Sequence, residues 1–505
     1  MEASPQVLWF KRDLRLHDHA PLCAAAQAGP LVALYIIEPV LWQQPDSSLR
    51  HWHFIRDSLQ ELAAGLTRRG GSLLVRTGDA VGVLETLRQD LGDLVLHSHE
   101  ETGNDWSYGR DRMVAAWCQS HGITWHEYPS HGVVRRLKSR DGWAQLRDTR
   151  MAEVVLPVPA SWQFLPSLNG DALPPKDSPR FGEPLAGRAQ PGGRSQGVKI
   201  LESFLLDRAK KYLQTISQPG VSARHCSRLS PHIAYGTLSV REIEQATRRR
   251  LAALATEPSA VSDPFTRNLA AFLSRLAWRC HFVQKLEQAP DIERRCMHPA
   301  FEGMREPYFR EDYFEAWKTG QTGYPLVDAC MRSLIANGWI TFRMRAMLVS
   351  FASYHLWLDW RQTAPYLAGL FTDYEPGIHY AQFQMQSGVT GINAVRMYNP
   401  VKQSIDNDPH GRFIRRYLPE LREVPDAFLH APWHWHTPPE GYKKPIVVHE
   451  DAIRLARQRL GQARQSDDFK AQAKQVYGRL GSRNRARSRT RTPKQVWRQL
   501  SLDLE

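Results

Sequence analysis

Several features that would narrow the class of this protein are missing from its sequence. Its six cysteines are scattered over 505 residues without a CxxC pair, and no signal-peptide pattern opens the chain. Both absences favour free thiols in a reducing, cytoplasmic compartment. An iron–sulfur cluster would require four of these cysteines to meet in space, which their spacing does not suggest.

Long apolar runs are also missing. The uncharged stretch at residues 346–358 is too short to span a bilayer, and the run HAPLCAAAQAGPLVALYII is interrupted by a Gly-Pro pair at residues 29–30. We therefore predict no membrane helix. With 42% hydrophobic and 23% charged residues, the chain has the composition of a globular protein of roughly two or three domains.

A glycine-rich fingerprint is absent from the first part of the chain, although the pattern there is that of an α/β domain. QVLWF, LVALYII, SLLVR and LVLHS are typical of strands, and HWHFIRDSLQELAAGLTRR is typical of an amphipathic helix between two of them. This alternation predicts a Rossmann-like, mainly parallel sheet over residues 1–130. The first strand runs into FKRDLRLHDH, which lacks the glycines that a dinucleotide pyrophosphate needs, so a Rossmann dinucleotide site is not expected.

The rest of the chain changes in character. Residues 131–199 are rich in proline and irregular, which is typical of an interdomain linker. Helical periodicity dominates residues 200–475, so we predict a large all-α domain there, with GWITFRMRAMLVSFASYHLWLDWR at residues 338–361 as one of its helices. Residues 476–505 are rich in arginine and poor in hydrophobic residues, which predicts a basic, flexible tail.

Charge indicates the class of partner. A formal net charge of +14 and a pI of about 9.6 favour a polyanionic partner, and nucleic acid before anionic lipid. Arg275 and Arg279 share a helical face with Trp278 beside them. Such a tryptophan can stack on a base while the arginines hold phosphates, although half-buried packing is the more common role.

A second arginine pair points in two directions. Arg343 and Arg345 are two residues apart and lie on roughly opposite sides of a helix. Arg345 is grouped with apolar residues and therefore faces the interior, where it needs a buried anionic partner. Asp373 or Glu375 in the segment TDYEPG is the expected carboxylate.

Two further groups of residues have simple explanations beside the functional ones. Ser230 and Pro231 resemble an N-cap and the first residue of a helix, whose N–H groups can bind a phosphate or can merely be capped. His430, His434 and His436 lie in a proline-rich stretch whose spacing does not favour metal ligation. We therefore expect no metal site.

A colinear series of long motifs resembles the photolyase/cryptochrome family. VLWFKRDLRLHDHAPL resembles its opening strand and loop, and SRLSPHIAYGTLSVRE its flavin-phosphate signature; TGYPLVDACMRSLIANGW, RMRAML, LDWR and RMYNPVKQSIDNDPHGRFIRRYLPEL continue the series. The resemblance implies an α/β domain that can hold an antenna chromophore, of folate or deazaflavin type, and an all-α domain that binds FAD. The type of antenna stays open.

The resemblance also implies roles for individual residues. Arg345 and Asp373 match the family's ion pair beside the isoalloxazine ring. Arg275, Trp278 and Phe342 fall in the catalytic lesion pocket, and Arg275, Trp278 and Arg343 are the expected DNA contacts. The cofactor-binding set that follows is Tyr212, Cys226, Ser227, Arg228, Leu229, Ser230, Arg279, Arg345, Asp373, Glu375 and His379.

The lesion pocket departs from the family's pattern. Arg275 stands where the common bacterial repair enzymes have a glutamate, and Thr341 and Phe342 stand where they have His-Asn. Both changes remove polar contacts that a cyclobutane dimer would receive, although Arg275 can still bind a phosphate or a carbonyl group.

The electron relay departs from the pattern as well. No tryptophan lies between Trp360 and Trp433, so the position nearest the flavin falls on Phe383 or Ala381. Trp360 matches the second position of the relay. The residue that faces flavin N5 is Gly377 or His379, and the expected electron-transfer residues are Trp360, Phe383, Trp339 and Trp357, with Tyr380 as a further detour.

The function implied by the resemblance is light-driven repair of pyrimidine dimers in DNA, by electron transfer from reduced FAD. A cryptochrome-like blue-light photoreceptor without repair activity is one alternative, favoured by Arg275 and Phe342. A basic nucleic-acid-binding flavoprotein is another, favoured by Trp278 and the arginine-rich tail. We expect a monomer in the cytoplasm.

Overall fold

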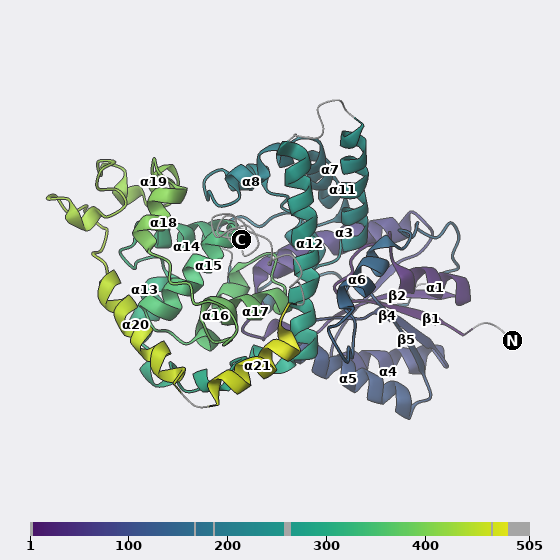
Figure 1. Cartoon of the computed structure of the whole chain (residues 1–505). Coiled ribbons are helices and arrows are strands. Elements are labelled where there is room, and N and C mark those ends of the chain that lie inside the picture. Colours follow the sequence, from purple (N-terminus) through teal and green to yellow (C-terminus); the bar gives the residue numbers. More distant parts are fainter. Residues whose placement is uncertain (1–3, 166–167, 185–186, 257–263, 466–467, 483–505) are drawn as a thin grey trace.

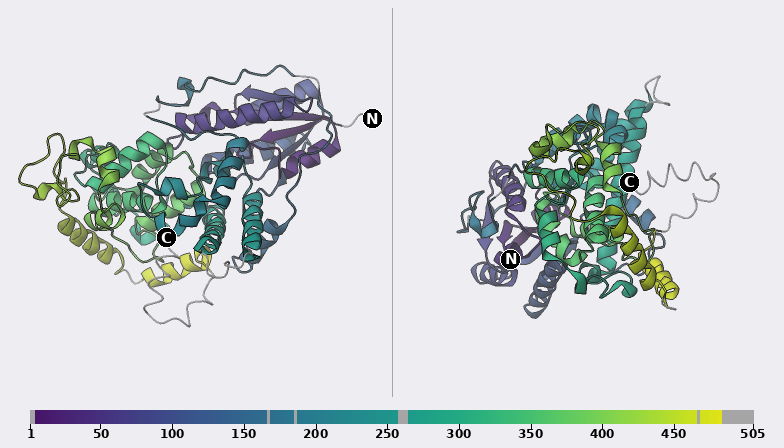
Figure 2. Two further views of the ribbon diagram at one scale, coloured as in Figure 1. Left: turned by 90° about the horizontal axis from the view of Figure 1, so that it is seen from above. Right: turned by 90° about the vertical axis from the view of Figure 1, so that its left-hand side faces the viewer.

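A computed structural model describes residues 4–165, 168–184, 187–256, 264–465 and 468–482. Figure 1 shows an α/β part and a larger helical part, with the long helix α12 (Pro264–Gln288) standing between them. Both views in Figure 2 show the same division. Among these residues no helix is both apolar enough and long enough to cross a membrane.

The α/β part is built on a five-stranded parallel sheet with the order β3-β2-β1-β4-β5. The first two strands are buried along their whole length, which is why they read as continuous hydrophobic runs. The fifth strand was not expected, because TWHEY lies at the sheet edge and is largely polar and exposed. The strands are β1 Gln6–Phe10, β2 Leu31–Ile37, β3 Leu73–Thr77, β4 Val95–His99 and β5 Thr124–Tyr128.

Alternate residues of the central strand fill two separate cores. Leu8 and Phe10 pack with residues of the helix α3, whereas Val7 and Trp9 pack with those of α4 and α5. The sheet is therefore covered on both faces, as the sequence pattern predicted. The helices of this part are α1 Ala20–Ala28, α2 Pro39–Trp42, α3 Leu49–Thr67, α4 Ala80–Leu91 and α5 Asp105–Ser120.

The predicted linker is more ordered than its proline content indicated. It contains the helix α6 (Trp143–Ala152), and Phe164 forms a parallel bridge with Leu31 at the start of β2. The Trp52 indole of α3 donates a hydrogen bond of 3.0 Å to the Pro175 carbonyl. The described parts of the linker thus contact both the α/β part and, through α6 and its Arg147–Glu244 ion pair, the helix α11 (Val240–Ala255) of the helical part.

The helical part confirms the predicted all-α character, and its described residues form no strand. Its largest core surrounds the fully buried Trp317 and Trp360. The helices are α7 Arg194–Leu206, α8 Tyr212–Thr215, α9 Ser222–His225, α10 Ser230–Ala234, α11 Val240–Ala255, α12, α13 Glu311–Lys318, α14 Pro325–Asn337, α15 Phe342–Ser350, α16 Trp360–Leu370, α17 Pro376–Gln386, α18 Pro400–Asn407, α19 Arg412–Tyr417, α20 His449–Ala463 and α21 Phe469–Leu480.

The segment 338–361 is not the single helix that its apolar periodicity predicted. After α15 the chain forms a π-helical turn at Phe351–His355, and Trp357 then adopts a left-handed φ of 54°. Asp359 caps the next helix by accepting a hydrogen bond of 2.8 Å from the Arg361 N–H. The periodicity identifies the buried face correctly, but it does not reveal this interruption.

The predicted basic tail begins later than residue 476. Val476 and Leu480 of α21 are buried in a small core together with Phe282 and Leu286 of α12. Their spacing of four residues places both on the apolar face of a packed helix. The remaining tail, residues 483–505, lies outside the described residues.

One arginine ties the two parts together beside the candidate site. Arg12, in the loop after β1, donates hydrogen bonds of 3.0 Å to the Ala234 carbonyl and 2.7 Å to the Tyr374 carbonyl. Its guanidinium also lies over the Tyr235 ring, 5.3 Å from the centroid. A side chain of the α/β part thus fixes the backbone of two segments of the helical part.

We expect the free energy of unfolding to fall as the pH is lowered from 7.5 to 5.5. Burial lowers the pKa of several histidines from 6.5 to about 3 or about 4. As the pH falls below 6.5, these histidines therefore bind protons in the unfolded chain but stay neutral in the folded chain. This stability is complete above pH 6.5 and is lost as the pH falls toward 4. The histidines are His51, His97, His99, His232, His355 and His379.

Buried carboxyl groups act in the opposite direction. Burial raises the pKa of Glu38 and Glu293 to about 7 and that of Asp328 to about 6, so these groups take up protons in the folded state first. The histidines outnumber them, and a net loss of stability remains. Urea unfolding at the two pH values, with FAD in excess, measures it; equal or greater stability at pH 5.5 would contradict the expectation.

Candidate functional site

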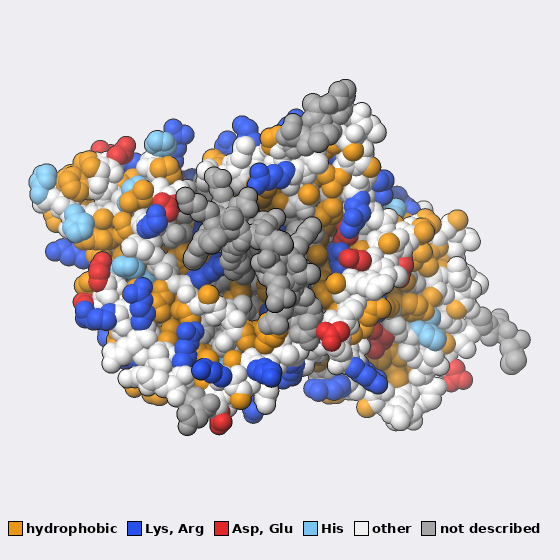
Figure 3. Space-filling model, viewed as in Figure 1, with side chains coloured by type: hydrophobic (Ala, Val, Ile, Leu, Met, Phe, Trp, Pro, Cys, Tyr) orange, Lys and Arg blue, Asp and Glu red, His pale blue; other side chains and the backbone are white. Residues whose placement is uncertain are grey.

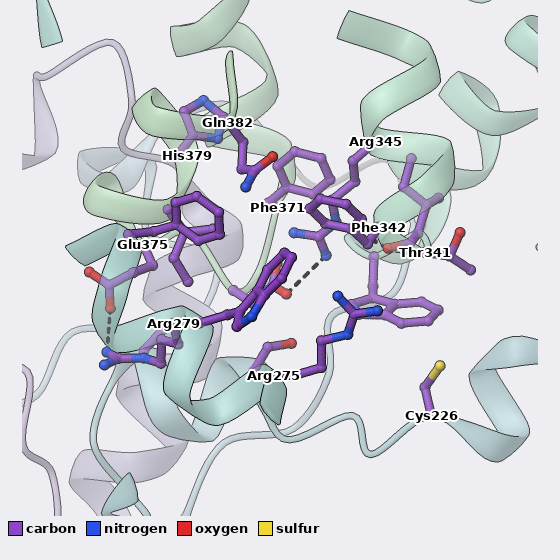
Figure 4. Close-up of a pocket in the computed structure, with 18 of the residues that line it drawn as sticks. Cys226, Arg275, Arg279, Thr341, Phe342, Arg345, Phe371, Glu375, His379 and Gln382 are labelled. Atoms are coloured by element: carbon purple, nitrogen blue, oxygen red, sulfur yellow. Dashed lines mark hydrogen bonds and ion pairs between the residues drawn. The ribbon is translucent and has the colours of Figure 1, made fainter. Parts of the chain in front are cut away.

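A cavity of about 320 Å³ lies in the helical part. Its walls come from α10, α12, α15 and α17 and from the segments before α15 and α17, and Figure 4 shows side chains converging on it from several helices. Most of the proposed site residues line it: Tyr212, Cys226, Ser227, Arg228, Ser230, Arg275, Trp278, Arg279, Trp339, Phe342, Arg345, Asp373, Glu375, His379 and Phe383.

Arg345 and Asp373 form the central ion pair of the cavity. Arg345 Nη2 lies 2.9 Å from Asp373 Oδ2, and the guanidinium is 4.0 Å from the centroid of the Phe371 ring. Burial alone would raise the pKa of Asp373, but the charge and hydrogen bond of Arg345 lower it below 3.8. The prediction of a buried carboxylate partner for Arg345 is thus confirmed, and the partner is Asp373.

A second ion pair stands beside the first. Arg279 of α12 donates a hydrogen bond of 2.7 Å to Glu375, and both side chains are largely buried. Arg279 Nη1 and Asp373 Oδ1 are buried without a hydrogen-bond partner in the described protein. The two pairs therefore present one N–H donor and one carboxylate acceptor to a ligand. FAD offers carbonyl and N–H groups of matching polarity, so the residues fit this cofactor.

The SRLSP segment borders the same cavity. Ser230 is the first residue of α10, with Leu229 at the N-cap and without a side-chain cap, so the expected Ser230 N-cap is wrong by one position. Leu229 itself packs in a neighbouring core and does not line the cavity. Cys226 and Ser227 do, and burial raises the pKa of the Cys226 thiol to about 12, which keeps it protonated.

Arg228 has no charged partner among the ion pairs of the described residues. It adopts a φ of 60°, stacks on Trp339 at 4.2 Å, and donates a hydrogen bond of 3.0 Å to Gln190. Burial lowers its pKa to about 10, so it is still cationic at neutral pH. A cationic guanidinium in the cavity wall is suited to hold a phosphate group.

Trp278 and Arg275 form an aromatic and cationic wall on α12. The Arg275 guanidinium lies 5.2 Å from the centroid of the Trp278 ring. Both residues line the cavity, together with Phe342 of α15. The sequence placed these three residues in one pocket, and the structure brings them together.

The two neighbours of Phe342 differ in their contacts. Thr341 lines the cavity and caps α15 by accepting a hydrogen bond of 3.3 Å from the Met344 N–H, which leaves its O–H as a donor. Arg343 donates a hydrogen bond of 2.8 Å to the Ser217 hydroxyl and does not line the cavity. Its role as a DNA contact stays a prediction.

Phe383 occupies the wall of the cavity at the place expected for the first member of an electron relay. Its ring is 4.6 Å from that of His379, and both residues line the cavity, whereas Ala381 packs in a separate core. His379 lines the cavity, whereas Gly377 lies against the backbone of Val283; which of them faces flavin N5 stays a prediction. Burial lowers the pKa of His379 to about 4, so its ring is neutral, and Nε2 donates to the Ala364 carbonyl at 2.8 Å.

Of the other proposed relay residues, Trp339 lines the cavity, whereas Trp360, Trp357 and Tyr380 do not. Trp360 is fully buried and contacts Tyr380 edge to face, with the ring centroids 6.5 Å apart. Trp357 lies between the guanidinium groups of Arg305, at 4.6 Å, and Arg459, at 4.9 Å. Trp360 has one such neighbour, the Arg361 guanidinium at 4.9 Å, so two cations disfavour a positive radical on Trp357 more than one does on Trp360.

Replacing Phe383 by tryptophan is expected to speed the photoreduction of bound oxidised FAD. An indole gives up an electron more readily than a phenyl ring, and Phe383 lines the cavity at the position expected for the first member of the relay. Steady blue illumination with an external thiol, followed by the fall of the oxidised flavin band, measures the rate. Adding Trp360→Phe should remove the gain; an unchanged rate in F383W at equal FAD content would contradict this route.

A second, smaller cavity lies at the carboxyl ends of β1 and β2, in the α/β part that the resemblance expects to hold an antenna. Its volume is about 90 Å³, below the roughly 300 Å³ at which pockets for drug-sized ligands begin. Arg110 lies in its wall with Glu38 at 2.9 Å, and the Tyr374 hydroxyl donates to Asp46 at 2.5 Å. A folate or deazaflavin does not fit this arrangement, and the antenna stays a prediction.

The described residues contain one group with metal-ligand geometry, outside this cavity. His19 and His99 each hydrogen-bond Asp13 Oδ2, at 2.9 and 2.7 Å, and Asp13 Oδ1 accepts a hydrogen bond from the Lys11 N–H. These bonds explain the group as a buried hydrogen-bond cluster. His430, His434 and His436 do not converge as ligands, and His430 bonds Ser404 instead.

Some residues of the cavity wall were not identified from the sequence. Phe371 and Tyr374 flank Asp373, and Gln382 and Gln386 lie one helical turn apart on α17. The sequence could have identified the two glutamines from their spacing to His379 and Phe383. Residues three or four apart share one face of a helix, so all four are expected to face the same cavity.

Comparisons with known proteins agree with this geometry. Residues 6–142 match the family model described as DNA photolyase, and residues 272–462 match that of the FAD binding domain of DNA photolyase. A cryptochrome DASH of Synechocystis sp. is 30% identical over 459 residues, which cover 85% of this chain and 90% of that protein.

Two further relatives cover nearly the whole chain. A deoxyribodipyrimidine photo-lyase of Alkalihalophilus pseudofirmus is 28% identical over 484 residues, covering 88% of this chain and 95% of that protein. The crystal structure of a Synechocystis sp. PCC6803 cryptochrome superposes with a TM-score of 0.78 at 26% identity, covering 91% of this chain and 100% of the other.

Proposed function

This chain belongs to the photolyase/cryptochrome family, and on that premise we propose that it repairs pyrimidine dimers in DNA with light, using FAD bound in the cavity of the helical part. The observation that carries the proposal is the composition of this one cavity. It contains a buried ion pair with an open carboxylate oxygen, and also an indole ring beneath a guanidinium group. The first is suited to a flavin, and the second to a base and its phosphate.

Residues of the cavity have distinct tasks in this function. Reduced FAD, when bound here, would supply the light-driven electron transfer that splits the dimer. Arg345, Asp373, Arg279 and Glu375 orient the cofactor through charged hydrogen bonds. The aromatic walls exclude water, and the neutral His379 adds no charge beside the ring system.

The substrate must leave the DNA duplex to enter this cavity. Trp278 offers a surface on which a flipped pyrimidine can stack, and Arg275 can bind its phosphate or a carbonyl group. Figure 3 shows basic side chains spread over the viewed face, with fewer acidic ones. This distribution supports a polyanionic partner. We propose DNA as that partner, bound by a monomer in the cytoplasm.

A blue-light photoreceptor is the second candidate. It is favoured by Arg275 and by Phe342, which line the cavity at the two positions where the resemblance expects polar contacts to a cyclobutane dimer. A flavoprotein that only binds nucleic acid would use Trp278 and Arg275 in the same way but would not need the open atoms of both ion pairs. The repair proposal uses all of these features together.

Blue-light repair of defined oligonucleotides tests the proposal. One substrate carries a cyclobutane dimer and another a (6-4) product, and the protein is used with FAD pre-reduced; dark samples are the control. We expect light-dependent reversal of one of the lesions. If neither lesion is reverted while FAD is bound at one equivalent, repair is refuted and photoreception takes its place.

A further inference from the structure

Gln382 presents a buried amide to the candidate cavity without a hydrogen-bond partner in the described protein. It projects from α17, and Figure 4 shows its amide pointing into the cavity near Phe371. Both Nε2 and Oε1 are buried and unpaired. Buried amides are rarely left in this state, because a donor and an acceptor lose their bonds to water without replacement.

A neighbouring glutamine shows what a purely structural amide looks like on the same helix. Gln384 donates hydrogen bonds to the Ile292 carbonyl at 2.8 Å and the Arg295 carbonyl at 2.5 Å, and it accepts one of 2.6 Å from the Met297 N–H. Gln384 points away from the cavity, two residues from Gln382. The amide of Gln384 is therefore fully hydrogen-bonded within the protein, whereas the amide of Gln382 is left to bind a ligand in the cavity.

We propose that Gln382 recognises an imide edge, the –CO–NH– group of a pyrimidine-type ring. A carboxamide holds a donor and an acceptor side by side, so its oxygen can accept from a ring N3–H while its NH₂ donates to the adjacent carbonyl. A thymine of the dimer and the pyrimidine-like ring of FAD both carry this edge. The inference rests on the proposed function, because it requires one of these two ligands in the cavity.

Gln382 offers the ligand a kind of contact that the wall of the cavity at α15 does not offer. Phe342 has no polar atom, and neither the Thr341 hydroxyl nor the Arg345 guanidinium holds a donor and an acceptor side by side, so α15 and its N-cap offer the ligand no carboxamide. Gln382 supplies one from α17. A cavity wall that lost polar groups on one helix thus keeps a matched donor and acceptor on another.

The test combines Gln382→Met with ligands methylated at N3. Methionine keeps the length of the side chain and removes the amide, and N3-methylation removes the ring donor. Binding is measured for oligonucleotides with a thymine dimer, with an N3-methylated thymine dimer and without damage. FAD retention is measured in parallel with FAD and 3-methyl-FAD. Gln362→Met, an exposed glutamine on α16, is the matched control.

The amide contact is expected to be worth about tenfold in affinity for its ligand. If the base is the ligand, Q382M and N3-methylation of the dimer each weaken dimer binding, and together they cost no more than either alone. If FAD is the ligand, the same non-additive pattern appears in FAD retention. Additive or absent effects in both arms, with the control unchanged, overturn the proposal.

The proposed function and this inference fail in different ways. Loss of light-dependent repair in the unaltered protein refutes repair, yet the FAD arm still reports on Gln382. Retained repair, with Q382M indistinguishable from the unaltered protein in both arms, refutes the role of Gln382 alone.

Discussion

Arg345→Met is expected to lose most of its FAD during purification. The substitution removes the guanidinium that lies 2.9 Å from Asp373, and the carboxylate, which is 4% exposed, is left without its cation. Breaking a buried pair from one side costs on the order of 3 kcal/mol, or about 100-fold in cofactor affinity. The ratio of flavin absorbance to protein absorbance after gel filtration measures the loss.

Arg343→Met is the matched control for this experiment. Arg343 lies on the same helix two residues earlier, bonds Ser217, and does not line the cavity. It should retain FAD as the unaltered protein does. Adding Asp373→Asn to R345M removes the uncompensated charge and should recover part of the cofactor. Full FAD content in R345M would refute the role of this ion pair in holding the flavin.

Trp278→Ala is expected to lower the affinity for dimer-containing DNA by about 10- to 100-fold. Stacking of a base on an aromatic side chain contributes roughly 1–3 kcal/mol. The substitution also removes the ring under the Arg275 guanidinium, which lies 5.2 Å from the ring centroid. Fluorescence anisotropy with damaged and undamaged oligonucleotides measures the effect, and repair under blue light should fall with it.

A second tryptophan under an arginine provides the comparison. Trp106 lies 5.6 Å from the guanidinium carbon of Arg110 in the α/β part, away from the cavity. Trp106→Ala should leave dimer binding unchanged, and Trp278→Phe should retain most of it because a ring remains. Equal binding by W278A and the unaltered protein would show that the dimer does not stack on Trp278.

The sequence predicted those features that depend on local periodicity and burial. The four strands that are rich in buried β-branched or leucine residues were identified from their pattern, and the fifth was not, because its edge position lets TWHEY be polar. The partner of Arg345 followed from the rule that a buried cation needs an anion, and Asp373 meets that need.

Other features depend on contacts between distant residues, which no local pattern encodes. The π-helical turn before Trp357 interrupts a segment that reads as one apolar helix. The open amide of Gln382 can be told apart from the engaged amide of Gln384 only when the partners on other segments are known. Sequence alone therefore located the site well but did not reveal which polar groups in it are free to bind a ligand.

Arg12 gives the α/β part a task that is independent of light harvesting. Its guanidinium reaches the carbonyl of Ala234 at the end of α10 and that of Tyr374, the residue after Asp373. Ala234 and Tyr374 both line the flavin cavity. The α/β part therefore holds the backbone of two segments that line the flavin cavity in a fixed position. A chain without an antenna would still need this part to keep the flavin in place.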